Sequence, residues 1–247
     1  MAAAKLDPLL ETLQTGKTTE DRLPVAEAIA AIVAEGGPKS LKEMDLFAKL
    51  VELMEMKKKP GAREGAACVV KLIAETSFDS TEAYLIDFMP TVLDLCGDKM
   101  KFVGEMSAAA CKTIIEKMNP YAAFKAVPML ISKMGNEDKW QTHVAALNCL
   151  GFLMLASGEQ VNLLMPQIVP KVAAMMWEMK QEVKDAASSC LEEVCGCIDN
   201  RDIEPFIPAL ISCIQHPDEV QECVHLLAGK NRNLTRRAVS VYLRKLD

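Results

Sequence analysis

One segment of the chain has the residue types of a phosphate-binding loop. Thr15-Gly16-Lys17-Thr18-Thr19 ends like the loop that cradles nucleotide phosphates. That motif also needs a glycine five residues before the Gly-Lys pair, a preceding strand and a following helix. The glycine position holds Glu11, and no strand-like run precedes it. We therefore interpret residues 15–19 as a turn between two helices.

A second cluster contains residue types that bind metal ions. Cys213, His216, Cys223 and His225 form a loose C-x2-H…C-x-H pattern, and zinc takes four such ligands when they converge as a tetrahedron. The two cysteines, however, lie in apolar helical runs on either side of His216. We therefore expect core thiols and a turn histidine here, and no metal site.

Catalytic side chains lack recognisable partners. The chain has three histidines, and Ser188-Ser189 forms no nucleophile–base pattern with any of them. Cys190, Cys195 and Cys197 are spread around a predicted helix, so we interpret them as packing residues. We expect no enzyme activity from the chain, no cofactor and no small-molecule substrate.

The composition is that of a helical protein without a membrane span. Half of the residues are hydrophobic but only 5% are aromatic, which favours helices over strands. No run of 18 apolar residues occurs, and the start, MAAAKLDPLLETL, lacks the apolar stretch of a secretory signal. Nine cysteines scattered through apolar segments are typical of reduced thiols. We expect a cytoplasmic protein that does not bind membranes.

The elements that must position any functional side chain repeat along the sequence. Pro90, Pro128, Pro170 and Pro208 are 38, 42 and 38 residues apart in similar surroundings: FMPTVL, AVPMLI, IVPKVA and FIPALI. A period of about 40–47 residues is typical of stacked helix pairs. Because each proline falls inside the first helix of its pair, we expect a kink in that helix.

Each unit is predicted to contain a first helix, a tight turn and a second helix. Apolar residues recur at every third or fourth position, which predicts helices buried along one stripe. One such set is Leu163, Pro166, Val169, Val172, Ala173 and Met176. Small residues in the second helices would let neighbouring helices approach closely. They are Ala66-Ala67, Ala109-Ala110, Ala145-Ala146 and Ala186-Ala187.

The sequence thus predicts an all-α solenoid of about five to six helix pairs. The pairs with a proline are 81–97 with 101–118, 120–134 with 139–156, 158–177 with 181–198, and 201–215 with a segment from Val220. Upstream, Leu41–Lys59 pairs with Arg63–Thr76, and 5–14 with 21–35. We divide the chain into degenerate N-terminal capping helices (1–40), the solenoid (41–227) and a basic C-terminal segment (228–247).

The proline in the first helix, the short polar turn and the V-K/R-x-A-A start of the second helix resemble HEAT repeats. Residues 166–191 are the clearest copy, with Val183, Lys184, Ala186 and Ala187 in the expected places. Three longer stretches resemble the N-terminal HEAT domain of translation elongation factor three, and the resemblance covers roughly residues 40 to 227. They are DKWQTHVAAL (138–147), MPQIVPKVAAMMWEMKQEVKDAA (165–187) and DNRDIEPFIPALISCIQHPDEVQECVHLL (199–227).

The resemblance implies a ribosome-docking module. Members of that family are ribosomal ATPases in which a HEAT domain precedes a helical bundle and two ATP-binding cassettes. The HEAT domain touches ribosomal proteins and rRNA, and the cassettes hydrolyse ATP. We expect this chain to correspond to the HEAT domain without the cassettes, which would belong to a longer protein. After Leu227 the sequence departs from the family's pattern.

Charge indicates where such a module would contact RNA. The net charge is −6, but residues 230–247 carry +5 and residues 1–229 therefore −11. An acidic body repels phosphate, so RNA contact requires a local basic stripe. We predict one along the turns, because stacked repeats align equivalent positions. Its residues are Lys99, Lys101, Lys139, Lys180 and Lys184, with Trp140 beside them and Lys57, Lys58, Lys59 and Arg63 in the preceding repeat.

Alternative interpretations stay open at this point. Solvated turns are often charged without binding anything, and Trp140 and Trp177 would also suit packing between repeats. The methionines at 175, 176 and 179 fit either core filling or an adaptable binding face. For the whole chain, the alternative to ribosome docking is a protein-binding HEAT scaffold unrelated to translation, such as a trafficking or kinase-regulatory adaptor.

Overall fold

The computed structural model describes residues 2–135 and 138–197, and every regular element in those ranges is a helix. The prediction of an all-α protein is therefore confirmed. The chain divides into two compact units between Met118 and Asn119. Within the described part, no helix is long and apolar enough to cross a membrane. The predicted boundary at residue 40 stays a prediction, and the one at residue 227 lies outside the described residues.

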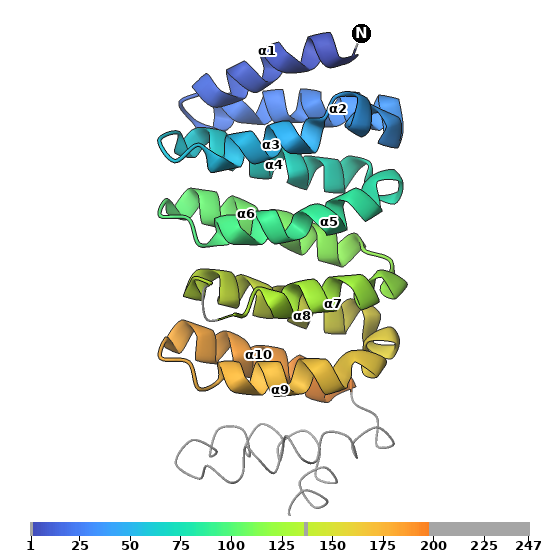
Figure 1. Ribbon diagram of the computed structural model, residues 1–247, viewed down its shortest axis with the longest axis vertical. Coiled ribbons are helices and arrows are strands. Elements are labelled where there is room, and N and C mark those ends of the chain that lie inside the picture. The colour runs from blue at the N-terminus through green and yellow to red at the C-terminus, as the bar shows by residue number, and fades with distance from the viewer. Residues whose placement is uncertain (1, 136–137, 198–247) are drawn as a thin grey trace, which may run out of the picture. The chain divides into compact units, whose positions relative to one another are not determined.

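The first unit contains three successive helix pairs (Figure 1). Among the second helices of these pairs, α4 packs on both α2 and α6, and α1, α3 and α5 each pack on the second helix of their own pair. The helices are α1 (Ala2–Thr15), α2 (Thr19–Glu43), α3 (Leu46–Glu55), α4 (Pro60–Thr76), α5 (Phe78–Cys96) and α6 (Lys101–Lys117).

The second unit contains two described pairs. Helices α8 and α10 pack along each other, α7 packs on α8, and α9 packs on α10. Two 3-10 turns, η1 and η2, precede the first helices of the two pairs. The elements are η1 (Pro120–Ala122), α7 (Ala123–Ser132), α8 (Trp140–Val161), η2 (Asn162–Leu164), α9 (Met165–Met175) and α10 (Gln181–Cys197).

The repeating prolines occupy the predicted place. Pro90 lies inside α5, Pro128 inside α7 and Pro170 inside α9, each the first helix of its pair. An internal proline removes one backbone hydrogen bond, and we therefore expect a bend in each of these helices. That bend stays a prediction. Pro208 lies outside the described residues.

The small residues of the second helices are buried where those helices meet. Ala66 and Ala67 in α4 are fully buried, as are Ala110 in α6 and Ala146 in α8. A side chain of one methyl group keeps the axes of stacked helices close and leaves the surrounding leucine, isoleucine and valine side chains to fill the core. These alanines are buried, as a packing role requires, and the close approach of the helices stays a prediction.

Local backbone geometry corrects the upstream boundaries. The helix that begins at Thr19 is interrupted at Gly37, whose φ of 61° is accessible to glycine at little cost, and then continues to Glu43. The predicted helix Leu41–Lys59 is wrong at its start, because Asp45 (φ 48°) separates the end of α2 from α3.

The predicted apolar stripe is also wrong at its N-terminal end. Leu163 lies in η2 and is 75% exposed, and Pro166, the second residue of α9, is exposed as well. The helix α9 begins only at Met165. Its buried stripe is Met165, Ile168, Val169, Val172, Ala173 and Met175.

Candidate nucleic-acid interface

In the first unit, the turns from first to second helices lie at the same end of the helices (Figure 1). They are the α1–α2, α3–α4 and α5–α6 turns. Antiparallel helices that stack in register bring equivalent turns side by side, so side chains on these turns form one edge of the unit. This edge carries every basic residue of the first unit that the sequence assigned to the stripe.

A buried ion pair joins the first two turns. Arg22 in α2 binds the carboxylate of Glu64 in α4 through Nε at 2.8 Å and through Nη2, and the two side chains are only 5% and 3% exposed. Thr19 donates its hydroxyl to Glu64 at 2.7 Å, and Arg22 donates to the carbonyl of Gly16 at 2.9 Å. The charges are thus paired and hydrogen-bonded, as burial requires.

Gly61 makes room for this pair. A Cβ at position 61 would lie 2.7 Å from Nη1 of Arg22. Any larger residue here would displace the guanidinium from the space between the two turns. The glycine at the start of α4 is therefore a packing requirement of the ion pair.

A second ion pair joins the next two turns and corrects the predicted stripe. Arg63 binds Asp98 through two bonds of 2.6 and 3.0 Å and also donates to the carbonyls of Met56 and Lys57 at 2.7 and 3.1 Å. Both charged side chains are 9% exposed. Arg63 was predicted as a surface cation of the basic stripe, and that prediction is wrong because its charge is buried against a carboxylate.

The lysines of the same turns remain at the surface. Lys57, Lys58 and Lys59 follow α3, and Lys99 and Lys101 flank the start of α6, and all five are exposed. Lys59 donates to the neutral amide oxygen of Gln14 at 3.2 Å. Lys101 lies 3.3 Å from Glu105, an exposed pair that contributes little.

In the second unit, the predicted site residues fall at two turns. Lys139 and Trp140 are at the start of α8, and Lys180 and Lys184 at the start of α10. Lys139 and Lys180 are exposed, whereas Trp140 and Lys184 are half-buried. Because α8 and α10 pack together, these residues share one edge of that unit. Whether the edge binds RNA stays a prediction.

Aromatic and sulfur side chains accompany the lysines of this edge. Trp177 is half-buried in the turn after α9. The neighbouring Met175 and Met176 are buried, as expected for core filling, but Met179 is 96% exposed. The turns of the second unit therefore expose an apolar side chain as well as lysines, as the α5–α6 turn of the first unit does with Met100, which is 41% exposed.

His143 is a buried polar residue whose environment the sequence did not indicate. Its side chain lies in the first turn of α8, and Nε2 is 2.9 Å from the carbonyl of Gly135. Nδ1 is buried without a hydrogen-bond partner. This hydrogen bond to a turn carbonyl ties the turn to α8.

Six cysteines, Cys68, Cys96, Cys111, Cys149, Cys190 and Cys195, are buried free thiols, as the sequence predicted for Cys190 and Cys195. Burial, with a smaller contribution from the carboxylate of Glu64, raises the pKa of Cys68 to about 11. Burial also raises the pKa of Cys190 to about 12, and Glu193 adds to the effect. These thiols stay protonated near neutral pH and are poor nucleophiles.

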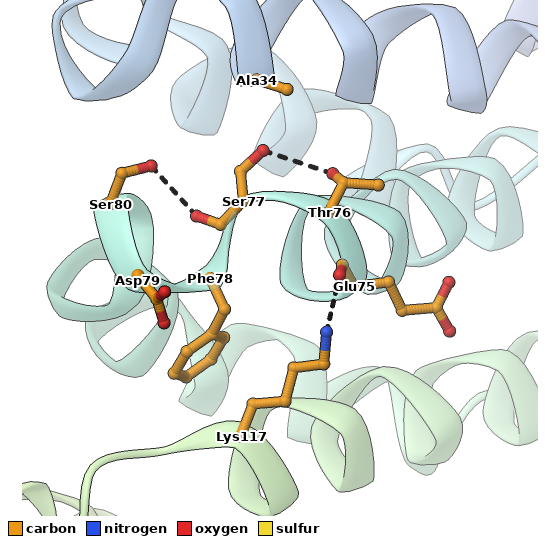
Figure 2. A pocket seen from close by; sticks show the side chains of 8 residues that line it. All are labelled: Ala34, Glu75, Thr76, Ser77, Phe78, Asp79, Ser80 and Lys117. Atoms are coloured by element: carbon orange, nitrogen blue, oxygen red, sulfur yellow. Dashed lines mark hydrogen bonds between the residues drawn. The ribbon is translucent and has the colours of Figure 1, made fainter.

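A hollow of about 440 Å³ lies at the other end of the first unit's helices, around the α4–α5 turn (Figure 2). Thr76, Ser77, Ser80 and Lys117 are among the residues that line it. Lys117 donates to the carbonyl of Glu75 at 2.6 Å, and Ser80 donates to that of Ser77 at 3.1 Å. Because these donors already bond to the chain, we assign no ligand to the hollow.

The phosphate-loop look-alike is a helix cap. Thr18 is the N-cap of α2, and its hydroxyl accepts from the backbone of Asp21 while the Asp21 carboxylate accepts from the backbone of Thr18. The backbone bond from Thr18 lowers the pKa of Asp21. In the described ranges, no cluster of His, Cys, Asp and Glu is suited to a metal ion. Cys213, His216, Cys223 and His225 lie outside them.

Known proteins resemble this chain in sequence. Elongation factor 3 of Gonapodya prolifera is 33% identical over 227 residues, which are 92% of this chain and 21% of that protein. Elongation factor 3 of Phytophthora infestans is 39% identical over 168 residues, 68% of this chain and 16% of that protein. Elongation factor 3B of Saccharomyces cerevisiae is 32% identical over 230 residues, 91% of this chain. The chain thus spans about a fifth of these relatives' length.

Solved structures share the fold at low identity. A chain from a solved structure that describes Kap95p binding to RanGDP superposes with a TM-score of 0.61 at 16% identity. The match covers 98% of this chain and 32% of that one. A mutant of Kap121p superposes with a TM-score of 0.56 at 15% identity, over 98% of this chain and 26% of that one. The fold is therefore a HEAT/armadillo-like repeat, with ten α-helices in the described residues.

A family model gives the assignment directly. The model described as "EF3 N-terminal HEAT repeat" matches residues 22–191, which include nearly all of the described helices after α1. Together with relatives of 32 to 39% identity, the chain belongs to the elongation factor 3 N-terminal HEAT-repeat family.

Proposed function

We propose that this chain is the ribosome-docking module of an elongation-factor-3-like translation factor and that it binds rRNA and ribosomal proteins. The observation that carries the proposal is the family match over residues 22–191. The relatives are named elongation factors, so a shared HEAT region most simply serves the same step of translation. Such a module would work in the cytoplasm.

The proposal assigns binding and not catalysis to this chain. Its match to the relatives is confined to about a fifth of their length, and the matched region is the HEAT repeat. Cys68 and Cys190 are buried thiols with a raised pKa, so they are poor nucleophiles. ATP-binding cassettes, where present, would be partners in a longer protein.

Turn edges support this mode of binding. Several lysines lie at the starts of second helices: Lys99 and Lys101 in the first unit, and Lys139, Lys180 and Lys184 in the second. Within each unit, packed helices can hold such residues against a large partner with little loss of conformational entropy. The binding would weaken with salt, because phosphate contacts release counterions.

Co-sedimentation with purified eukaryotic ribosomes tests the proposal. The unmodified chain should pellet with ribosomes, and the bound fraction should fall as salt increases. Charge reversal of Lys139, Lys180 and Lys184 to Glu should reduce binding by about tenfold or more. Failure of the unmodified chain to pellet with ribosomes at low salt would reject the proposal of ribosome docking. Unchanged binding of the reversed variant would remove those three lysines from it.

The likeness to Kap95p and Kap121p does not support the alternative of a protein-binding scaffold unrelated to translation. Identities of 15 to 16% show a shared fold and no shared partner.

A further inference from the structure

The turns of the first unit separate their charges. The segments 56–63 and 97–104 contain five lysines, one arginine and a single acidic residue, Asp98. Asp98 is occupied by Arg63 in a buried bidentate pair. The only carboxylate in these two segments therefore neutralises a buried arginine and not an exposed lysine.

Lys57, Lys58 and Lys99 accordingly form no ion pair with any residue that the structure describes. Three other lysines of the unit do form ion pairs: Lys49 lies 2.6 Å from Asp7, Lys71 3.0 Å from Glu75 and Lys112 3.6 Å from Glu116. We name Lys57, Lys58, Lys59 and Lys99 the lysine edge.

Arg63 also fixes where the lysine edge lies. Its guanidinium bonds to the carbonyls of Met56 and Lys57 in one turn and to Asp98 in the next. Asp98 in turn accepts from the backbone of Met100 at 2.8 Å. Arg63 thus binds the backbone carbonyl of Lys57 and the side chain of Asp98, the residue before Lys99. The lysines are presented from a braced backbone, so binding need not order the turns.

The residues around the lysine edge indicate which kind of nucleic acid it binds. In these segments the one aromatic residue, Phe102, is half-buried, so the lysine edge offers no platform on which single-stranded bases stack. Unpaired cations on a braced edge suit a regular row of phosphates, which is what an RNA duplex presents. Acidic residues lie beside the other lysines of these turns: Glu20 and Asp21 are near Lys17 in the sequence, and Glu105 pairs with Lys101. The basic surface is therefore limited to the lysine edge.

We propose that the lysine edge binds the phosphate backbone of double-stranded RNA, and that Arg63 is a positioning residue that keeps Asp98 from neutralising it. The choice of RNA over other polyanions rests on the proposed function. The contact is sequence-independent, because it reaches phosphates and no bases.

The test compares two triple variants of the full chain with the same change in net charge. Lys57→Gln/Lys58→Gln/Lys99→Gln removes three unpaired lysines, and Lys49→Gln/Lys71→Gln/Lys112→Gln removes three paired ones. The probe is a labelled mixed-sequence RNA duplex of about 24 base pairs followed by fluorescence anisotropy, with the single strand as competitor. Circular dichroism checks that both variants fold.

The edge variant should bind the duplex at least about tenfold more weakly at about 0.1 M salt, with a log–log salt slope smaller by about 2–3. The control variant should lose less than about twofold. Equal losses in the two variants, an unchanged edge variant, or a single strand that competes better than the duplex would each overturn the proposal.

The role of Arg63 has its own readout. Arg63→Gln leaves all lysines in place but frees Asp98, so duplex affinity should fall by about threefold. Adding Asp98→Asn should restore it, because the freed carboxylate is then gone. A double variant that stays as weak as Arg63→Gln would show a merely structural role and overturn the assignment.

Ribosome co-sedimentation of the same variants separates this inference from the proposed function. Duplex binding without ribosome binding by the unmodified chain would reject the proposed function and leave the lysine edge as an RNA site. Ribosome binding together with unchanged duplex binding by the edge variant would do the opposite.

Discussion

In the first unit, buried arginine–carboxylate pairs join successive turns, whereas the second unit uses other side chains at the equivalent positions. Counted from the alanine pairs, Glu64 in α4, His143 in α8 and Lys184 in α10 each lie two residues before the first alanine. Glu64 is buried in an ion pair, His143 is buried with one hydrogen bond, and Lys184 is half-buried. The same position of the repeat thus carries a negative, a neutral or a positive group.

This difference has a consequence for the surfaces of the two units. Because the arginines bury the acidic side chains Glu64 and Asp98, the charged side chains exposed in the α3–α4 turn and at Lys99 are lysines. The second unit has no described ion pair of this kind, and its turns expose Met179 beside half-buried tryptophans. Exposed lysines without paired carboxylates suit phosphate, and a turn that exposes a methionine beside aromatic side chains suits a protein surface with its own apolar and charged groups.

Removal of Glu64 should give the largest loss of stability in the first unit. Glu64→Ala leaves the guanidinium of Arg22 buried and without its carboxylate, which should lower the free energy of unfolding of the first unit by about 3–5 kcal/mol. Guanidinium denaturation gives the size of the loss, and amide hydrogen exchange should localise it to α1–α4. The double change Arg22→Leu/Glu64→Leu should cost much less, since no charge then stays buried. An equal loss in the double variant would mean that packing, not charge pairing, sets the cost.

Asp98→Asn separates stability from RNA binding within the first unit. It weakens two charge-assisted hydrogen bonds to Arg63, so the unfolding free energy should fall by about 2 kcal/mol. The same change adds one positive charge at the lysine edge, so affinity for the RNA duplex should stay equal or increase. Urea titration and anisotropy of one protein preparation measure both. A parallel fall of stability and affinity would contradict the separation of charges at these turns.

The helical framework was predictable from the sequence because its signals are local. Pro90, Pro128 and Pro170 recur at the repeat period, and a residue as small as Ala67 leaves room for a neighbouring helix whatever else surrounds it. The ends of elements were less predictable. Leu163 fits the apolar period but lies in a 3-10 turn before the helix, where the period has no meaning.

The state of the charged residues was not predictable in the same way. Arg22 and Glu64 are 42 residues apart, and Arg63 and Asp98 are 35 apart. Whether an arginine faces solvent or a carboxylate is decided by the stacking of one repeat on the next, which leaves no pattern within a repeat. The stripe was therefore predicted with Arg63 as a surface cation, although the neighbouring lysines are exposed as expected.

A smaller effect is expected where the second unit uses a neutral side chain. His143→Leu removes one hydrogen bond to the carbonyl of Gly135 and should cost about 1 kcal/mol, well below the loss for Glu64→Ala. Because Nδ1 has no partner to lose, the apolar substitute relieves one unsatisfied buried atom. Denaturant titration gives the loss, and hydrogen exchange should confine it to α7 and α8. A cost as large as that of Glu64→Ala would show that charge is not what distinguishes the two positions.

The effect that is smallest at neutral pH, where it vanishes, compares one thiol in each unit. The folded-state pKa values of Cys68 and Cys190, about 11 and about 12, lie above the ordinary value of 9.0 because both thiols are buried. A raised pKa means that the folded state holds its proton more tightly. Stability from these groups is therefore complete below pH 9 and is lost as the pH rises towards 11 for Cys68 and 12 for Cys190, by up to about 1.4 kcal/mol per pH unit for each thiol. Cys68→Ala should remove this slope from the first unit and Cys190→Ala from the second, as measured by denaturant titrations between pH 8 and pH 11.

Since the carboxylate of Glu64 adds to the shift of Cys68, Glu64→Gln should lower the pKa of Cys68 alone and leave alkylation of Cys190 unchanged. Faster alkylation of both thiols in that variant would instead mean that the loss of the ion pair opens the whole chain.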